Sequence, residues 1–110
     1  MVCSAKQKGY RTVRKGREEL EADGWYTESV EKTGKFVAQK DLFGLFDVVA
    51  IKPGRTKLIQ YKTNRIEGVK ITQQFSKDYP QFECEIWGWY NYKGWSKRCF
   101  IAGKKIEYKR

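Results

Sequence analysis

Two runs rich in apolar residues lie close together near the middle of the chain, residues 46–51 (FDVVAI) and residues 57–63 (KLIQYKT). A short polar segment that contains Pro53 and Gly54 separates them. A Pro-Gly pair between two β-branched, apolar runs is typical of a hairpin turn. The pattern therefore predicts two antiparallel strands that are neighbours in one sheet.

Residues 5 to 23 have the periodicity of a helix, with Ser4 as a suitable N-cap and Gly24 as a suitable end. Apolar side chains recur at helical spacing, at Tyr10, Val13 and Leu20. Gly16 lowers the helix propensity by about 1 kcal/mol relative to Ala. The first turns are otherwise mostly basic, which favours a helix face directed at phosphate groups.

Four more segments have a regular pattern. Residues 25–31 alternate and predict a strand, and residues 71–79 predict a short helix. Residues 82–90 and 98–102 predict two further strands, with a turn at 92–95. This order of elements predicts an α/β fold, a small mixed central β-sheet flanked by helices.

Composition narrows the class of protein. The 110 residues are enough for one domain with one modest core, so we expect a single domain over residues 1–110. The net charge is +10, and 15% of the residues are aromatic. A small domain that is so basic is expected to bind a polyanion, and nucleic acid is the predicted partner.

Several kinds of protein are not expected. No apolar run approaches a membrane span and no secretory signal is visible, so no membrane partner is expected. The chain has no histidine, and its cysteines, Cys3, Cys84 and Cys99, form no C-x-x-C pair. This disfavours zinc chemistry and a disulfide framework and indicates a reducing, cytoplasmic location.

One polar cluster lies within the apolar central strands. Asp47 precedes the first apolar run, and Gln60 and Lys62 lie on the second. Because side chains alternate along a strand, Gln60 and Lys62 share one face and Tyr61 takes the other. A carboxylate and an amide oxygen can hold a hard divalent cation, and a lysine can orient a water. The alternative is that Asp47 only caps a strand and the other two face solvent on an edge strand.

The spacing of this cluster resembles the signature of the PD-(D/E)XK nuclease superfamily. Asp47 is followed by twelve residues and then by Gln60-x-Lys62, the variant with Gln in place of the second acid. The apolar run 48–51 and the segment 20–25 (LEADGW) resemble archaeal and phage Holliday junction resolvase-like endonucleases. The resemblance covers roughly residues 9 to 75.

The resemblance implies a restriction-endonuclease-like αβββαβ core and a metal-dependent endodeoxyribonuclease that acts on structured or branched DNA such as a four-way junction. It implies that Asp47, Gln60 and the Tyr61 carbonyl bind Mg²⁺, with Mn²⁺ as a substitute, and that Lys62 positions the attacking water. It also implies a homodimer and a prokaryotic or viral protein that acts in the cytoplasm. The expected nucleic-acid contacts are Arg11, Arg14, Lys15, Lys32, Lys35 and Gln73.

The chain departs from the resolvase pattern at one point. Resolvase-like nucleases carry a metal-binding Glu in the first helix, and the matching position falls at or next to Val13, where no acid is present. Glu18 or Glu19 reaches the metal only if the helix register differs. Two alternatives therefore stay open. One is a non-catalytic nucleic-acid-binding module on the same fold, and the other is a PD-(D/E)XK nuclease that acts on non-junction DNA.

Overall fold

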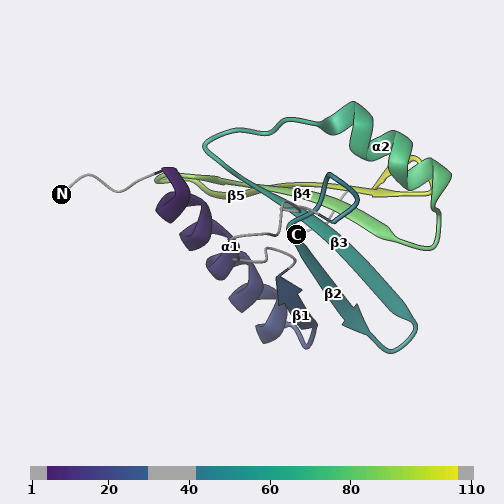
Figure 1. Ribbon diagram of the computed structural model, residues 1–110, viewed down its shortest axis with the longest axis horizontal. Helices are drawn as coiled ribbons and strands as arrows, with labels where there is room; N and C mark the ends of the chain where they lie inside the picture. The colour runs from purple at the N-terminus through teal and green to yellow at the C-terminus, as the bar shows by residue number, and fades with distance from the viewer. Residues whose placement is uncertain (1–4, 30–41, 107–110) are drawn as a thin grey trace, which may run out of the picture.

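A computed structural model describes residues 5–29 and 42–106, with side chains of the first helix from residue 11 onward. The elements follow in the order α1 (Ala5–Ala22), β1 (Tyr26–Ser29), β2 (Val48–Lys52), β3 (Arg55–Thr63), α2 (Val69–Asp78), β4 (Glu83–Tyr90), β5 (Gly94–Ile101) and β6 (Lys104–Ile106). The strands form one six-stranded sheet in which spatial order follows chain order (Figure 1). All neighbouring strands are antiparallel except β3 and β4, which are parallel because α2 connects them.

The two helices cover opposite faces of the sheet (Figure 1). On the α1 side, Leu20 belongs to a buried cluster with Ile59 of β3 and Trp87 of β4. On the α2 side, Phe75 packs against a second cluster that contains Leu58 and Cys84. Leu58 and Ile59 are consecutive, so their side chains point to opposite faces and each face has its own apolar core.

Gly16 sets the distance between α1 and the sheet. A Cβ atom at this position would overlap the ring of Tyr61 on β3. Thr12, one helical turn earlier, forms a hydrogen bond of 2.7 Å between its Oγ1 and that of Thr63. The glycine that weakens the helix in isolation therefore allows α1 to lie close to β3.

The predicted fold class is confirmed, as are the first helix and the hairpin at Pro53-Gly54. The first six elements follow the expected αβββαβ order. Several boundaries were wrong. The strand β2 begins at Val48 instead of Phe46, β3 and α2 each begin two residues earlier than predicted, and β5 already starts at Gly94. The strand β1 spans Tyr26–Ser29 of the predicted 25–31, and residues 30–31 lie outside the described residues. The short strand β6 was not predicted, and the loop with Lys32 and Lys35 lies outside the described residues.

Candidate functional site

Asp47 lies where β2 and β3 stop pairing. The last paired residues are Val48 and Ile59. The backbone N–H of Asp47 donates to the carbonyl of Ile59 at 2.9 Å, so Asp47 stays bonded to β3 one residue beyond the last strand pair. The carboxylate Oδ2 accepts a hydrogen bond of 2.8 Å from the N–H of Tyr61. Asp47 is therefore fixed to β3 on both sides of Gln60.

Gln60 and Lys62 share the α2 face of β3, as predicted. Ile59 and Tyr61 belong to the α1-side core, and alternation places Gln60 and Lys62 on the other face. Gln60 is only 9% exposed, and β3 lies between β2 and β4. The alternative, that these residues face solvent on an edge strand, is therefore wrong for Gln60.

The side-chain oxygen of Gln60 is a buried acceptor. Within the described part of the chain, Oε1 is shielded from solvent and accepts no hydrogen bond. It lies beside Gly68, the N-cap of α2, where an added Cβ would come within 3.4 Å of it. A buried acceptor without a donor costs about 1–3 kcal/mol, so this oxygen suits a cation or a bound water.

Lys62 is held by an acid that the sequence pattern did not identify. Its Nζ lies 3.2 Å from Glu67 Oε1, and Arg65 reaches the same oxygen at 3.3 Å. The Lys62 side chain is 19% exposed, whereas that of Glu67 is 52% exposed. Glu67 lies in the connection between β3 and α2, and only the path of that connection brings it to Lys62.

The donor set fits a hard cation with few protein ligands. Asp47 supplies a carboxylate and Gln60 an unpaired amide oxygen. Among the residues that the structure describes, no three His, Cys, Asp or Glu side chains gather to hold a metal. Mg²⁺ commonly keeps several waters and takes only one or two carboxylates, so a single acid with an amide oxygen is a sufficient minimal set. The Tyr61 carbonyl remains a predicted ligand.

No acid of α1 is directed at this cluster. Val13, the position that matches the helix Glu of the resolvases, packs against the α1-side core. Glu18 pairs with Arg14 at 3.4 Å, and Glu19 pairs with Lys97 of β5 at 3.1 Å. The departure from the resolvase pattern that the sequence showed is thus also present in the fold.

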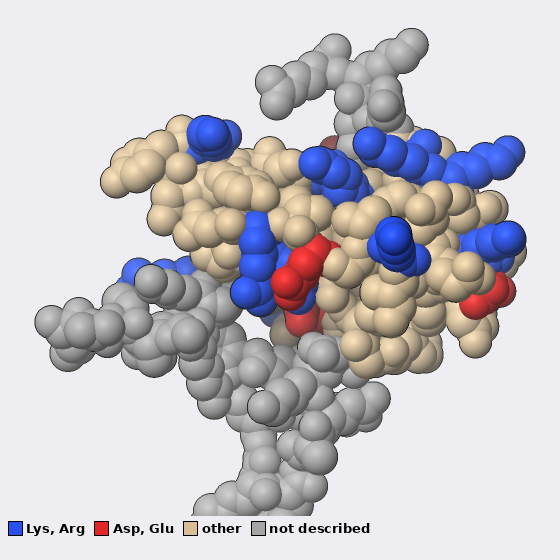
Figure 2. All heavy atoms as spheres, turned by 90° about the horizontal axis from the view of Figure 1, so that it is seen from above, with Lys and Arg blue, Asp and Glu red and all other residues tan. Residues whose placement is uncertain are grey.

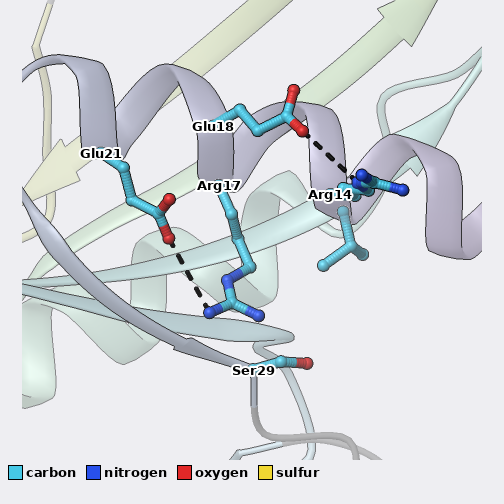
Figure 3. A pocket seen from close by; sticks show the side chains of 6 residues that line it. Arg14, Arg17, Glu18, Glu21 and Ser29 are labelled. Carbon is cyan, nitrogen blue, oxygen red and sulfur yellow. Dashed lines mark ion pairs between the residues drawn. The ribbon is translucent and has the colours of Figure 1, made fainter.

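The side of α1 towards β1 lines a cavity of about 490 Å³ (Figure 3). Arg17 pairs with Glu21 there at 3.9 Å and donates from Nε to Thr27 Oγ1 at 3.0 Å. Two of the predicted DNA contacts on this helix, Arg11 and Arg14, are exposed. Each arginine drawn in Figure 3 has a carboxylate partner, so the cavity itself has little excess positive charge.

Lys15 and Gln73, two further predicted DNA contacts, already have protein partners. Lys15 Nζ lies 3.8 Å from the centre of the Trp89 ring. Gln73 Nε2 donates to the carbonyl of Gly103 at 2.8 Å and lines a shallow groove. Lys32 and Lys35 lie outside the described residues.

A buried ion pair on the α1 face was also missed by the sequence pattern. Lys57 Nζ lies 2.8 Å from Glu85 Oε2, and the two side chains are 8% and 0% exposed. Trp87 Nε1 donates to Glu85 Oε1 at 2.7 Å, and the Cys99 thiol donates to Oε2 at 3.5 Å. Alternation in residues 82–90 did identify the strand, but only the parallel pairing of β3 and β4 brings Lys57 to Glu85.

A scan of the chain against protein-family models and a search of the curated proteins both return no match. In the described residues no helix is long and apolar enough to cross a membrane.

Proposed function

We propose that this chain is a magnesium-dependent endodeoxyribonuclease that hydrolyses phosphodiester bonds of structured or branched DNA. Two observations support this most directly: the bond from the Tyr61 N–H fixes the Asp47 carboxylate against the β3 backbone next to Gln60, and the side-chain oxygen of Gln60 is buried without a hydrogen bond. Lys62 lies on the same face as Gln60, two residues along β3. An acid, an amide oxygen and an ammonium group on neighbouring residues of this kind suit phosphoryl chemistry.

Asp47 and Gln60 would hold Mg²⁺, which supplies Lewis-acid stabilisation of the phosphate charge when it is bound. Asp47 is preorganised for this role because the Tyr61 N–H fixes one of its oxygens. The Lys62 ammonium, positioned by Glu67, orients the water that attacks phosphorus and stabilises charge on the phosphate oxygens. The attack breaks the bond between phosphorus and the leaving oxygen, in line with the incoming water.

Single-turnover cleavage tests the proposal. A four-way junction, a flap and a linear duplex are incubated with the parent in Mg²⁺, in Mn²⁺ and in EDTA. Asp47→Asn and Lys62→Ala should abolish cleavage, while Gln60→Glu should retain it because it adds a charged oxygen at the same reach. The matched control is Asp78→Asn, which neutralises an exposed acid that is bonded to Gln74 on α2. Full activity of Asp47→Asn would place the metal site elsewhere.

Metal binding supplies a readout that is independent of turnover. In calorimetric titrations with Mn²⁺, Asp47→Asn should lose binding and Gln60→Glu should bind more tightly. Lys62→Ala should bind Mn²⁺ as the parent does, because an ammonium group is not a ligand. A resolvase-like substrate is two-fold symmetric, so the proposal includes a homodimer, which sedimentation measurements would detect.

A non-catalytic DNA-binding module on the same fold is the second candidate. The observation that favours it is the absence of an acid from the site side of α1, where Val13 packs into the core. A parent protein that binds DNA but cleaves none of the three substrates in Mg²⁺ or Mn²⁺ would establish this alternative.

A further inference from the structure

Basic side chains of the described residues divide into two groups by their partners. Most of those on α1, β2 and β3 pair with a carboxylate, as Arg17, Arg55 and Lys62 do. Lys70, Lys77 and Lys105 are exposed and form no ion pair with another residue that the structure describes. Exposed cations elsewhere, such as Arg11 on α1 and Lys93, also form no ion pair with a described residue. The lysines over α2 and β6 are distinguished by their position on one face of the molecule.

These three lysines lie on one face of the molecule. Lys70 and Lys77 are on α2, seven residues apart, which is about two helical turns or 10.5 Å. Lys105 of β6 lies opposite Phe100, which in turn lies opposite Cys84 of the α2-side core, so Lys105 is on the α2 face as well. Figure 2, which looks down on the side where α2 lies at the top of Figure 1, shows several lysine and arginine side chains over this face.

A groove of about 380 Å³ lies between α2 and the turn from β5 to β6. It is lined by Lys70, Gln73, Gln74, Lys77 and Gly103. The turn is fixed on the helix because both backbone groups of Gly103 are bonded. Its N–H donates to Ser76 Oγ at 2.9 Å, and its carbonyl accepts from Gln73 Nε2 at 2.8 Å. The walls of the groove are therefore held together before a ligand arrives.

The chemistry of the lining identifies the ligand class. The lining contains no apolar side chain, which disfavours a lipid surface or the apolar centre of a protein interface. Ammonium and amide N–H groups are the donors that contact phosphate oxygens in protein–DNA complexes. Gln73 and Gln74 each have one hydrogen bond from Nε2, and a side-chain amide has a second hydrogen to donate.

We infer that this groove binds the phosphodiester backbone of duplex DNA and acts as an anchoring surface separate from the Asp47 cluster. The choice of DNA as the polyanion rests on the proposed function, whereas the location of the surface rests on the unpaired lysines and the groove. DNA that is held here crosses the α2 face, on which Gln60 and Lys62 also lie.

The test compares two double variants by fluorescence anisotropy with a labelled 20-base-pair duplex in EDTA, where no metal-dependent cleavage takes place. Lys70→Gln/Lys77→Gln removes two charges from the groove. The matched control, Lys93→Gln/Lys104→Gln, removes two exposed lysines outside it. Lys93 lies in the turn between β4 and β5, and Lys104 lies opposite Ile101, on the face away from Lys105. Thermal melting checks that both variants are folded.

The groove variant should bind about ten-fold more weakly at moderate salt, and its slope of log K against log salt should be shallower by about 1.8, which corresponds to two lost phosphate contacts. The control should keep the parental slope. Equal losses in both variants would mean that only net charge matters and would overturn the inference. If polyglutamate displaces the labelled duplex as strongly as unlabelled duplex does, the groove binds an acidic protein instead and the inference is overturned.

The cleavage assay is run separately on the same variants, so that the two proposals can fail independently. If the parent does not cleave DNA but the groove variant binds DNA more weakly than the parent and the control, the anchoring surface is supported and the nuclease proposal is overturned. If the parent cleaves DNA but the groove variant binds DNA as tightly as the parent, the nuclease proposal is supported and the anchoring surface is overturned.

Discussion

Tyr61 links the core on the α1 face to the candidate site through its side chain and its backbone. Its ring fills the space that Gly16 leaves on α1 and lies edge-on to Trp87, with ring centres 5.6 Å apart. Its backbone N–H fixes the carboxylate of Asp47. Because the ring is locked between α1 and Trp87, the backbone that positions Asp47 and Gln60 is held rigidly.

The Gly16→Ala variant should be less stable than the parent, although Ala favours an isolated helix by about 1 kcal/mol. The added Cβ overlaps the Tyr61 ring, and overpacking of this kind costs about 1–3 kcal/mol. Urea unfolding followed by circular dichroism measures the change. The control is Arg11→Ala, an exposed position on the same helix, which should change stability by less than about 0.5 kcal/mol. A stabilised Gly16→Ala protein would show that α1 does not pack this closely.

Stability should fall as the pH rises above 9. Burial, and secondly the neighbouring Glu85, raise the pKa of the Cys84 thiol from 9.0 to about 12. The unfolded chain loses this proton near pH 9 while the folded protein keeps it, so the free energy of unfolding falls by up to about 1.4 kcal/mol per pH unit between pH 9 and 12. Burial also raises the pKa of Tyr61, which extends the loss above pH 10.

Urea unfolding of the parent and of Cys84→Ala between pH 7 and 12 isolates the thiol. The difference in free energy between the two proteins should shrink as the pH rises above 9. Leu58→Ala truncates a neighbour in the same core without removing a titrating group, so its difference from the parent should stay constant. A constant difference for Cys84→Ala as well would contradict a raised pKa for this thiol.

At the scale of elements, the parallel pairing of β3 with β4 organises both faces. It places Lys57 beside Glu85 on the α1 face, and it places Leu58 opposite Cys84 on the α2 face. The crossover that makes the pairing parallel also brings Glu67 to Lys62 and places Gly68, the N-cap of α2, beside Gln60. The β3–α2–β4 unit thus shapes the surroundings of Gln60 and Lys62, whereas Asp47 comes from the residue that precedes β2.

Removing one partner of the buried ion pair should lower the free energy of unfolding far more than replacing both partners by apolar residues. Glu85→Ala leaves the Lys57 ammonium and the Trp87 N–H without their carboxylate and should destabilise the protein by about 3–5 kcal/mol. Lys57→Met/Glu85→Leu keeps the volume without buried charge and should stay close to parental stability. The control, Arg14→Ala, breaks an exposed ion pair with Glu18 and should destabilise the protein by less than about 1 kcal/mol. Urea unfolding measures the free energy of unfolding of all three variants. A large loss in the double variant would mean that the pair itself is strongly stabilising.

At the scale of the whole molecule, the net charge of +10 is unevenly compensated. Acids of α1 and β4 neutralise many neighbouring cations, such as Arg14, Arg55 and Lys97. The lysines over α2 and β6 lack such partners among the described residues. The electrostatic potential at the protein surface therefore depends on the positions of the acidic residues as much as on the positions of the lysines.

DNA binding by the parent should depend steeply on salt. Four or more phosphate contacts give a slope of log K against log salt near −4, so affinity should fall by about 10²-fold between 50 and 200 mM salt. Fluorescence anisotropy with an unmodified duplex measures the slope. An affinity that does not change with salt, or no binding at low salt, would remove the polyanion interpretation altogether.

The sequence by itself determined most of the elements and which side chains of β3 share a face. Two apolar runs around Pro53-Gly54 predicted the hairpin. Alternation placed Gln60 and Lys62 on one face with Tyr61 on the other, because this periodicity is a property of a single strand. Helical spacing predicted α1 and α2 for the same reason. The start of β2 was missed because the strand begins only where its residues pair with neighbouring strands, and the local pattern does not show where that pairing starts.

Only the tertiary structure decided which distant residues meet. In the sequence Gly16 only weakens a helix, and its role in the close packing of α1 on Tyr61 is seen only in the fold. In the same way, only the parallel pairing of β3 and β4 shows that Glu85 lies 2.8 Å from Lys57. The same holds for Glu67 beside Lys62 and for Gly103 clamped on α2. These contacts join residues that are far apart in the chain or connected by a loop, and periodicity within one element has no information about them.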